Sequence, residues 1–205
     1  MITLLFTENN NINTIGNESI GGKLLISFFQ SVVTRTAGFN SIDLSKIKET
    51  SAPIMIVLMF IGASPASTGG GIKTTTFAVL LMSTLTEIQE NKDINIFKKR
   101  IPDETISKSV AIVTIALIWL IIISIIITGV DNIGFIESLF ETTSAQGTVG
   151  MSMGITSSLS NFSKILLSIT MFFGRVGGLT IAMAVSYSKS HEDSYRYAEE
   201  NIIVG

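Results

Sequence analysis

Long apolar stretches of this chain alternate with short segments that hold most of its charges. The charges gather between Glu87 and Lys108 and in the tail after Tyr187, whereas Val110 to Thr128 contains none. At about 1.5 Å per residue, a helix over that uncharged stretch would reach roughly 28 Å, close to the hydrocarbon thickness of a bilayer. Its many isoleucines favour strands in water, but in lipid only a helix satisfies the backbone of a single span. The pattern predicts a transmembrane helix, with Trp119 packed against a neighbouring helix.

Two further apolar stretches are expected in the membrane. One runs from about Asn161 to Tyr187 and contains two basic residues, one near its start and one in its middle. The other begins at Pro53, a residue suited to a first helical turn, and continues to Leu85. A glycine-rich segment, 62–71, divides it into halves that are each too short to cross a bilayer. We therefore predict a broken transmembrane helix with irregular backbone at membrane depth.

Two shorter amphipathic segments, Leu24 to Thr34 and Phe135 to Ala145, cannot span a bilayer, and each precedes a glycine-containing stretch. Such segments can enter the membrane and return as re-entrant pore helices. A shift of 112 residues superimposes three features of the chain: Thr36-Ala37-Gly38 on Thr148-Val149-Gly150, Phe28 on Phe140, and Gly62 on Gly174. The sequence thus predicts an all-α integral membrane fold of K+-channel-like helix–pore-loop–helix repeats, of which the second is complete.

The two Thr-x-Gly segments are candidates for a selectivity filter. A dehydrated cation needs several oxygens in place of its water shell, and backbone carbonyls of extended Thr-x-Gly strands supply them, with glycine permitting the unusual backbone angles. The candidate K+ ligands are the backbone carbonyls of Thr36, Ala37, Gly38, Phe39, Thr148, Val149, Gly150 and Met151. The alternative is that these glycines form ordinary turns between helices, although turns do not explain the repeat.

Arg175 lies within an apolar stretch, is expected to be buried, and is the second functional candidate. A charged residue at that depth costs on the order of 3 kcal/mol, so it should face protein or water. The glycine-rich break is a natural partner, because irregular backbone at membrane depth marks transport paths. The predicted gate below the filter comprises Gly62, Ser64, Ser67, Thr68, Gly69, Gly70, Gly71, Lys73 and Arg175. Two alternatives stay open: a purely structural arginine bonded to backbone carbonyls, and a Lys73 that only anchors the chain at the interface.

Composition narrows the function further. Charged residues make up 15% of the chain, against about 25% in soluble domains. The net charge of −2 gives no reason to expect nucleic acid binding, and the absence of cysteine excludes thiolate metal sites. The sequence shows no pairing of a nucleophile with a base that would suggest catalysis. Basic residues gather in the Glu87–Lys108 loop and the tail, so the positive-inside rule places both, with the C-terminus, in the cytoplasm.

These features divide the chain into four parts. We assign 1–86 to a pore loop and broken second helix, 87–107 to a cytoplasmic loop, 108–188 to a complete repeat and 189–205 to a cytoplasmic tail. Met1 to Phe6 resembles the stump of a longer hydrophobic helix. A pore of this kind needs about four filter strands around one axis, and this chain supplies two. We therefore expect a fragment of a longer polypeptide rather than an assembly of several copies.

The chain resembles the TrkH/KtrB/HKT superfamily of K+ transporters, and its KtrB (NtpJ-like) branch most closely. The resemblance rests on segments 28–40, 62–74, 147–152, 174–177 and the tail 200–205. It implies four repeats in one polypeptide, of which this chain matches the third from its pore loop onward and all of the fourth. It further implies that Gly38 and Gly150 are filter glycines, that 62–71 is an intramembrane gating loop, and that Arg175 is the gate arginine. Gly178 stands where many relatives have proline.

The resemblance also implies partners and a location. Members are multi-pass proteins of the bacterial plasma membrane, form homodimers with one pore per subunit, and bind a cytosolic RCK-type nucleotide-sensing ring. The expected function is K+ uptake without a covalent cofactor, with Na+ as a candidate coupling ion. Two alternatives remain: a Na+-selective or Na+-coupled relative, and a non-conducting truncated product that acts only as an assembly partner.

Overall fold

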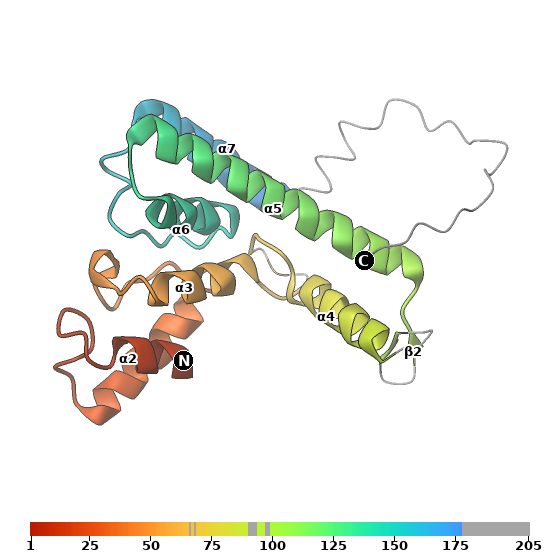
Figure 1. Cartoon of the computed structure of the whole chain (residues 1–205), viewed down its shortest axis with the longest axis horizontal. Helices are drawn as coiled ribbons and strands as arrows, with labels where there is room; N and C mark the ends of the chain where they lie inside the picture. Colours follow the sequence, from red (N-terminus) through yellow and green to blue (C-terminus); the bar gives the residue numbers. More distant parts are fainter. Residues whose placement is uncertain (66, 68, 90–93, 97–98, 178–205) are drawn as a thin grey trace.

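The computed structural model describes residues 1–65, 67, 69–89, 94–96 and 99–177, and its described part is mainly helical (Figure 1). The elements follow in the order α1 (Ile2–Glu8), α2 (Ile20–Val33), η1 (Leu44–Lys46), α3 (Ser51–Phe60), α4 (Thr74–Ile88), β1 (Asn95–Ile96), β2 (Lys99–Arg100), α5 (Asp103–Asp131), α6 (Phe135–Gln146) and α7 (Asn161–Val176). The antiparallel pair of two-residue strands β1 and β2 is the exception to the helical expectation.

Helix α5 contains the predicted uncharged span and extends beyond it at both ends. Its first turn carries Asp103 and Glu104, which favour a helix N-terminus, and Glu104 pairs with Lys108 at 2.6 Å. The helix ends where Asn132 adopts a left-handed conformation, with φ of 51°. Within the described ranges, α5 is the one helix long and apolar enough to cross a membrane, judged by length and composition.

The third predicted span is broken as expected. Helices α3 and α4 are separated by residues 61–73, and the neck of this segment is closed by backbone hydrogen bonds. The N–H of Gly62 donates to the carbonyl of Ile72 at 2.8 Å, and the N–H of Ile72 donates to that of Phe60 at 3.1 Å. Helix α3 begins at Ser51, so Pro53 lies within its first turn, where a missing N–H costs little.

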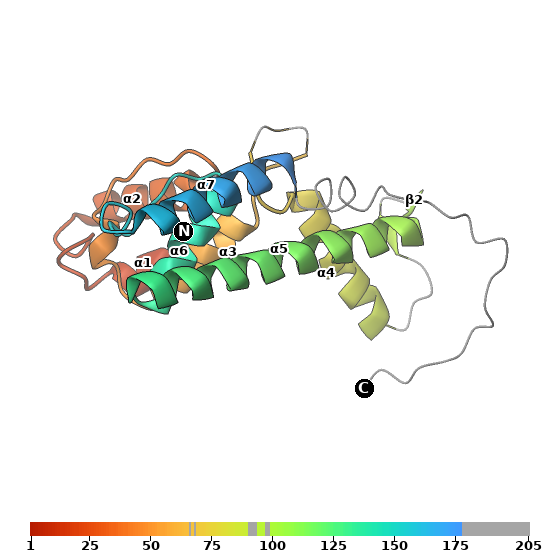
Figure 2. The ribbon, with the colours of Figure 1, turned by 90° about the horizontal axis from the view of Figure 1, so that it is seen from above.

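The two predicted pore helices are α2 and α6. Helix α2 starts before the predicted Leu24, because the Ser19 hydroxyl accepts a hydrogen bond from the N–H of Gly22 and caps the helix. Helix α6 lies between α3 on one side and the α5–α7 pair on the other (Figures 1 and 2). The chain thereby encloses its second pore helix within its own elements.

The repeat reappears in the way that each second helix is anchored. Ser51 at the start of α3 donates to the carboxylate of Glu8, at the end of α1. In the second copy Asp131, at the end of α5, accepts from the N–H of Ser160, the residue that caps α7, at 3.2 Å. In both copies an acidic residue ending the first helix therefore fastens the start of the second.

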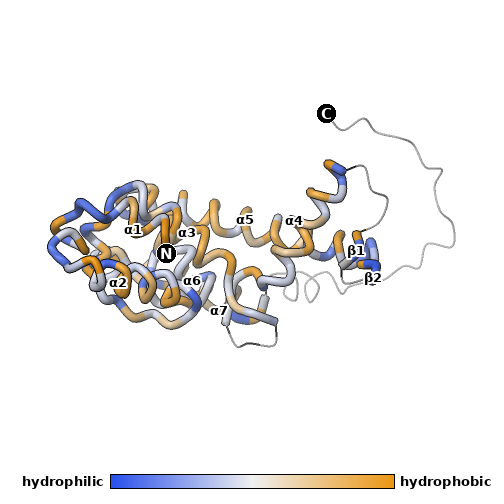
Figure 3. Tube along the Cα trace, turned by 90° about the horizontal axis from the view of Figure 1, so that it is seen from below, coloured by the Kyte–Doolittle hydropathy of each residue, from blue (hydrophilic) through white to orange (hydrophobic). Residues whose placement is uncertain are grey.

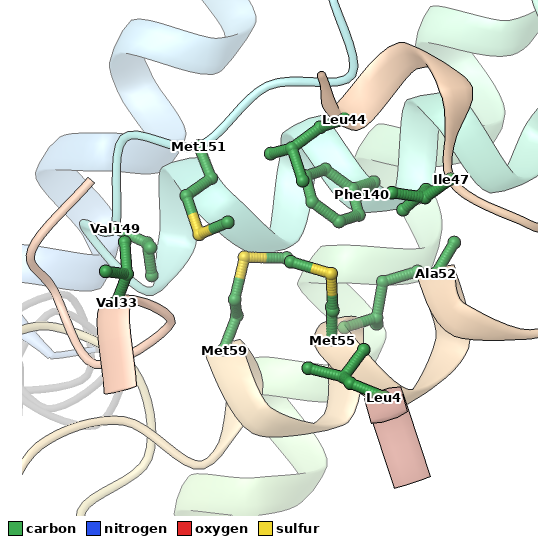
Figure 4. Close-up of a cluster of buried hydrophobic side chains, with 11 residues drawn as sticks. Leu4, Val33, Leu44, Ile47, Ala52, Met55, Met59, Phe140, Val149 and Met151 are labelled. Atoms are coloured by element: carbon green, nitrogen blue, oxygen red, sulfur yellow. The ribbon is translucent and has the colours of Figure 1, made fainter. Parts of the chain in front are cut away.

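The main apolar core joins the two copies. Phe140 of α6 packs with Met55 and Met59 of α3 and with Val149 and Met151, all buried (Figure 4). Residues of the predicted filter therefore form part of the core.

A second contact joins α5 to α7. The Trp119 ring stacks on Phe173 with centroids 4.4 Å apart, and its indole N–H donates to the Thr170 hydroxyl at 3.2 Å. The expectation that Trp119 packs against a neighbouring helix is confirmed. Of the predicted span from Asn161 to Tyr187, residues after Gly177 lie outside the described ones.

Hydropathy varies along the molecule as expected for a membrane protein. Hydrophilic stretches colour the loops beyond α1 and α2 and the β2 end, and apolar positions dominate the helices between them (Figure 3). Many large apolar side chains on those helices are exposed, including Leu25, Phe28, Ile122 and Phe172. Such surfaces fit lipid or further protein better than water.

Candidate functional site

The two Thr-x-Gly segments share an unusual backbone. Thr36 and Gly38 have φ of 67° and 71°, and Thr148 and Gly150 have φ of 52° and 87°. A threonine in the left-handed region costs roughly 1–2 kcal/mol, so the surrounding packing must impose it. In a regular strand successive carbonyls point to opposite sides. Alternation of left-handed and ordinary conformations can turn them toward one side, as a carbonyl-lined filter requires.

The two Thr-x-Gly segments, 36–38 and 148–150, are the predicted filter segments, and they lie against each other. A Cβ on Gly38 would be 2.6 Å from the carbonyl oxygen of Val149, and one on Gly150 would be 3.8 Å from Cα of Gly38. Segments 112 residues apart are thus brought together, and glycine at 38 is required by both its φ and its close approach.

Each filter segment follows directly from the C-terminal end of a pore helix. The N–H of Thr148 donates to the carbonyl of Ala145 at 3.1 Å, and that of Val149 to Ser144 at 2.9 Å. In the first copy the N–H of Ala37 donates to Val33 at 3.3 Å. A helix C-terminus carries the negative end of the helix dipole, so both pore helices favour a cation at the filter.

The glycine-rich loop contacts both predicted filter segments. The N–H of Gly70 donates to the Thr148 hydroxyl at 2.8 Å, and the N–H of Gly71 donates to the carbonyl of Gln146 at 3.2 Å. A Cβ on Gly69 would lie 2.9 Å from the Thr36 methyl. The loop therefore touches both filter segments, and its glycines allow that approach.

Lys73 belongs to this loop and does not extend away from it. Its ammonium donates to the carbonyl of Gly69 at 2.6 Å and to that of Ser67 at 3.2 Å. The Ser67 hydroxyl donates in turn to the carbonyl of Ser64 at 2.7 Å, on an exposed part of the loop. Thr68 lies outside the described residues.

Arg175 occupies the last turn of α7 and is exposed among the described residues, so the expectation of a buried arginine is wrong for this part of the chain. The preceding residue, Gly174, packs against the end of α6 so closely that a Cβ would overlap the carbonyl of Gln146. That carbonyl is also the acceptor of the Gly71 N–H. The loop and the helix that carries Arg175 thus meet at one point, the C-terminus of the second pore helix.

Two residues near the filter were not anticipated. Arg35 donates through Nη1 to the carbonyl of Gly62 at 2.9 Å, which ties the entry of the first filter segment to the start of the loop. Gln146 donates through its amide to the carbonyl of Ala116 in α5 at 3.1 Å. Arg35 carried a signal in the sequence, because it is a charge beside a filter motif in an otherwise uncharged stretch. The partner of Gln146 could not be read from the sequence.

Comparison with known proteins identifies the family of the chain. The family model TrkH, described as a cation transport protein, matches residues 2–196. The chain belongs to the TrkH family. It is 39% identical to the Ktr system potassium uptake protein B of Vibrio alginolyticus, over 99% of the chain and 45% of that protein. It is 37% identical to the Ktr system potassium uptake protein B of Bacillus subtilis, over 100% of the chain and 46% of that protein.

A more distant relative and a solved structure extend the comparison. The chain is 30% identical to the potassium/sodium uptake protein NtpJ of Enterococcus hirae, over 100% of its length and 46% of NtpJ. The crystal structure of the potassium transporter TrkH from Vibrio parahaemolyticus matches with a TM-score of 0.75 at 16% identity, covering 92% of this chain and 43% of that one. The fold is therefore that of TrkH, and the chain spans about half the length of these relatives. Membership in this family implies a membrane location.

Proposed function

We propose that this chain supplies two filter segments and the gate of a transporter that takes up K+ across the plasma membrane. The observation that carries the proposal is the contact of one glycine-rich loop with two left-handed Thr-x-Gly segments. Bare backbone oxygens at the segments and a flexible obstruction beneath them are what a selective, gated cation path needs. The potassium uptake proteins similar to this chain support K+ as the substrate.

Selectivity is tested at the second filter glycine. Gly150→Ser should lower the ratio of K+ to Na+ uptake, because a serine at φ of 87° is strained and distorts the neighbouring carbonyls. The measurement is uptake of both ions in cells that lack their own K+ uptake systems, with the chain expressed together with any in-frame sequence encoded upstream. An unchanged ratio in a variant that reaches the membrane would overturn the filter assignment.

A Na+-permeable transporter is the second candidate. NtpJ is named a potassium/sodium uptake protein, and it is similar to this chain over the whole of it. Glycine at both 38 and 150 favours K+, since a serine at a filter glycine often accompanies Na+ permeation in this superfamily. Na+ as a coupling ion predicts K+ uptake that rises with external Na+. K+ uptake that is independent of Na+ would exclude that role.

The gate is proposed to be loop 62–71, Lys73 and Arg175. Lys73 holds the loop compact by capping two of its carbonyls, and the loop in turn meets α7 next to Arg175. A fixed positive charge on the path repels a passing cation. Arg175→Ala, or a deletion within 62–71, should therefore raise the K+ uptake rate. Wild-type rates in variants that fold would exclude this gate.

The proposal also covers assembly and orientation. The chain acts together with the remaining repeats of one polypeptide, and that polypeptide forms a homodimer. An RCK-type nucleotide-binding ring binds the dimer from the cytosol. The C-terminus lies on the same side of the membrane. Support comes from the chain spanning 45% of the Vibrio alginolyticus relative and from the exposed apolar side chains of α2. An in-frame stop codon in the DNA upstream of Met1, together with purified protein that transports no K+, would instead support the hypothesis of a non-conducting assembly partner.

A further inference from the structure

A second set of contacts joins each pore helix to the chain segment beyond its filter. The Ser41 hydroxyl donates to Oε1 of Gln30 at 3.0 Å. The Ser152 hydroxyl donates to Oε1 of Glu141, and the Thr156 hydroxyl donates to the same oxygen at 2.9 Å. In both copies the serine follows its acceptor by 11 residues. We call Gln30–Ser41 and Glu141–Ser152 the bracing pairs.

Both acceptors are buried. Gln30 is 2% exposed and Glu141 is 5% exposed. Placing an amide or a carboxyl group there is costly unless hydrogen bonds compensate it, and an apolar side chain would serve the packing better. The polar side chains of Gln30 and Glu141 are therefore best explained by their hydrogen bonds to the segment that follows each filter glycine.

The pair in the second copy is the more developed of the two. Its single carboxylate oxygen accepts from two hydroxyls, and Ser152 additionally accepts from the N–H of Gly154 at 2.9 Å. Glu141 also lines a cavity of about 360 Å³ together with Thr148, Gly150, Met151, Ser152 and Thr156. This cavity borders the filter segment, whose Val149 and Met151 side chains pack in the core. On the cavity side the hydrogen bonds of Glu141 add to that packing.

The pairs do not follow the 112-residue register. A shift of 112 places Gln30 on Thr142 and Ser41 on Met153. The second bracing pair, Glu141–Ser152, therefore lies one residue before the positions that match the first pair. Its acceptor extends from the neighbouring position on the pore helix. The same connection is thus made from two different positions, which favours a requirement of the filter over a by-product of the repeat.

We infer that Gln30 and Glu141 are positioning residues that hold the outer end of each filter segment and thereby set its preference for K+ over Na+. The inference rests on the proposed function, since it assigns these residues to the same filter. An amide serves in the first copy, so the hydrogen-bond acceptor is the required feature, and the negative charge of Glu141 is dispensable.

The experiment compares variants in proteoliposomes, using the K+ to Na+ uptake ratio and the amount of folded protein as readouts. Glu141→Ala and Ser152→Ala should each lower the ratio about fivefold, the scale of one neutral hydrogen bond. The double variant should be no worse than Glu141→Ala alone. Glu141→Gln, which keeps an acceptor oxygen, should stay near wild type. Ser158→Ala is the matched control, because that hydroxyl bonds only the Ile155 carbonyl among the described contacts of the same loop.

The outcomes separate this inference from the function on which it rests. A wild-type protein that does not prefer K+ overturns the proposed function. A selective wild type with equally selective Glu141→Ala and Ser152→Ala variants overturns the bracing pairs alone. A fall in Glu141→Gln as deep as in Glu141→Ala overturns the acceptor role in favour of charge. If Glu141→Ala fails to fold, Ser152→Ala decides, because it removes one atom from a partly exposed side chain.

Discussion

The two pore helices have the same place in the repeat but different surroundings. Every residue of α6 from Phe140 to Gln146 is buried, whereas α2 buries only Ser27, Gln30 and Val33 among its fourteen residues. Helix α6 is enclosed by α3, α5 and α7, and α2 leaves an apolar face exposed. Among the described residues, the pore helix before the second filter segment is therefore enclosed, whereas the one before the first keeps an open apolar face. Substitutions at matched positions of the two copies test this difference.

The largest difference is expected at the glycines that face the loop and α6. A Cβ at Gly174 would overlap the carbonyl of Gln146, which ends the enclosed α6. A Cβ at Gly62 would overlap the carbonyl of Gly70, which belongs to the glycine-rich loop. Overpacking typically costs about 1–3 kcal/mol where neighbours cannot move. Gly174→Ala should therefore lose most folded protein in detergent, and Gly62→Ala should remain folded.

The control for that pair is Gly129→Ala in α5. Nothing lies within 4 Å of a Cβ there, and alanine favours a helix over glycine. This variant should yield as much folded protein as the wild type. Equal yields from Gly174→Ala and Gly129→Ala would contradict the close packing of α7 on α6.

An intermediate difference is expected at the filter glycines. Both have positive φ, but a Cβ on Gly38 would be 2.6 Å from the Val149 carbonyl, whereas Gly150 has room for one. Gly38→Ala should therefore reduce K+ uptake at least about tenfold more than Gly150→Ala, since only the former adds a backbone collision to the strain. Initial uptake rates, normalised to protein in the membrane, measure the difference. A Gly150→Ala variant that is the worse of the two would reverse the assigned geometry.

The smallest difference is expected at the serines that anchor α3 and α7. Ser51→Ala removes a hydroxyl from the buried Glu8, which is 2% exposed, and Ser160→Ala removes the hydroxyl that caps α7 by accepting from the N–H of Ser163 at 3.2 Å. Each should cost about 1 kcal/mol, and Ser51→Ala should cost more because its partner is desolvated. That corresponds to roughly 2–4 °C in the unfolding temperature. Ser168→Ala, whose hydroxyl bonds its own helix, is the control. A larger shift in the control than in Ser51→Ala would refute the anchoring role.

Much of the helical arrangement was predictable, because spacing and uncharged length carry it. The break at 62–71, the pore helix after α5 and the long apolar span all follow from local composition. The start of α2 was predicted too late, because the Ser19 cap extends the helix into a stretch with weak periodicity. The short β1–β2 pair was not predicted, since two-residue strands leave no pattern.

The candidate site was predictable in its members but not in its contacts. Residues of both filter segments and the loop could be named from the glycines, yet their pairing depends on the fold. The bonds from Gly70 to Thr148 and from Arg35 to Gly62 join residues 78 and 27 positions apart. The roles of these residues in ion binding and gating remain predictions.

One cross-link tests the central claim most directly, namely that the loop obstructs the path beneath the filter. The chain has no cysteine, and a Cβ on Gly70 would lie 2.7 Å from the Thr148 methyl. Cysteines at the two positions therefore fall within disulfide reach. The double variant, Gly70→Cys with Thr148→Cys, should take up K+ when reduced and stop when oxidised, with both single variants insensitive to oxidation. If K+ uptake after disulfide formation is as fast as in the protein with free thiols, the result would contradict the account.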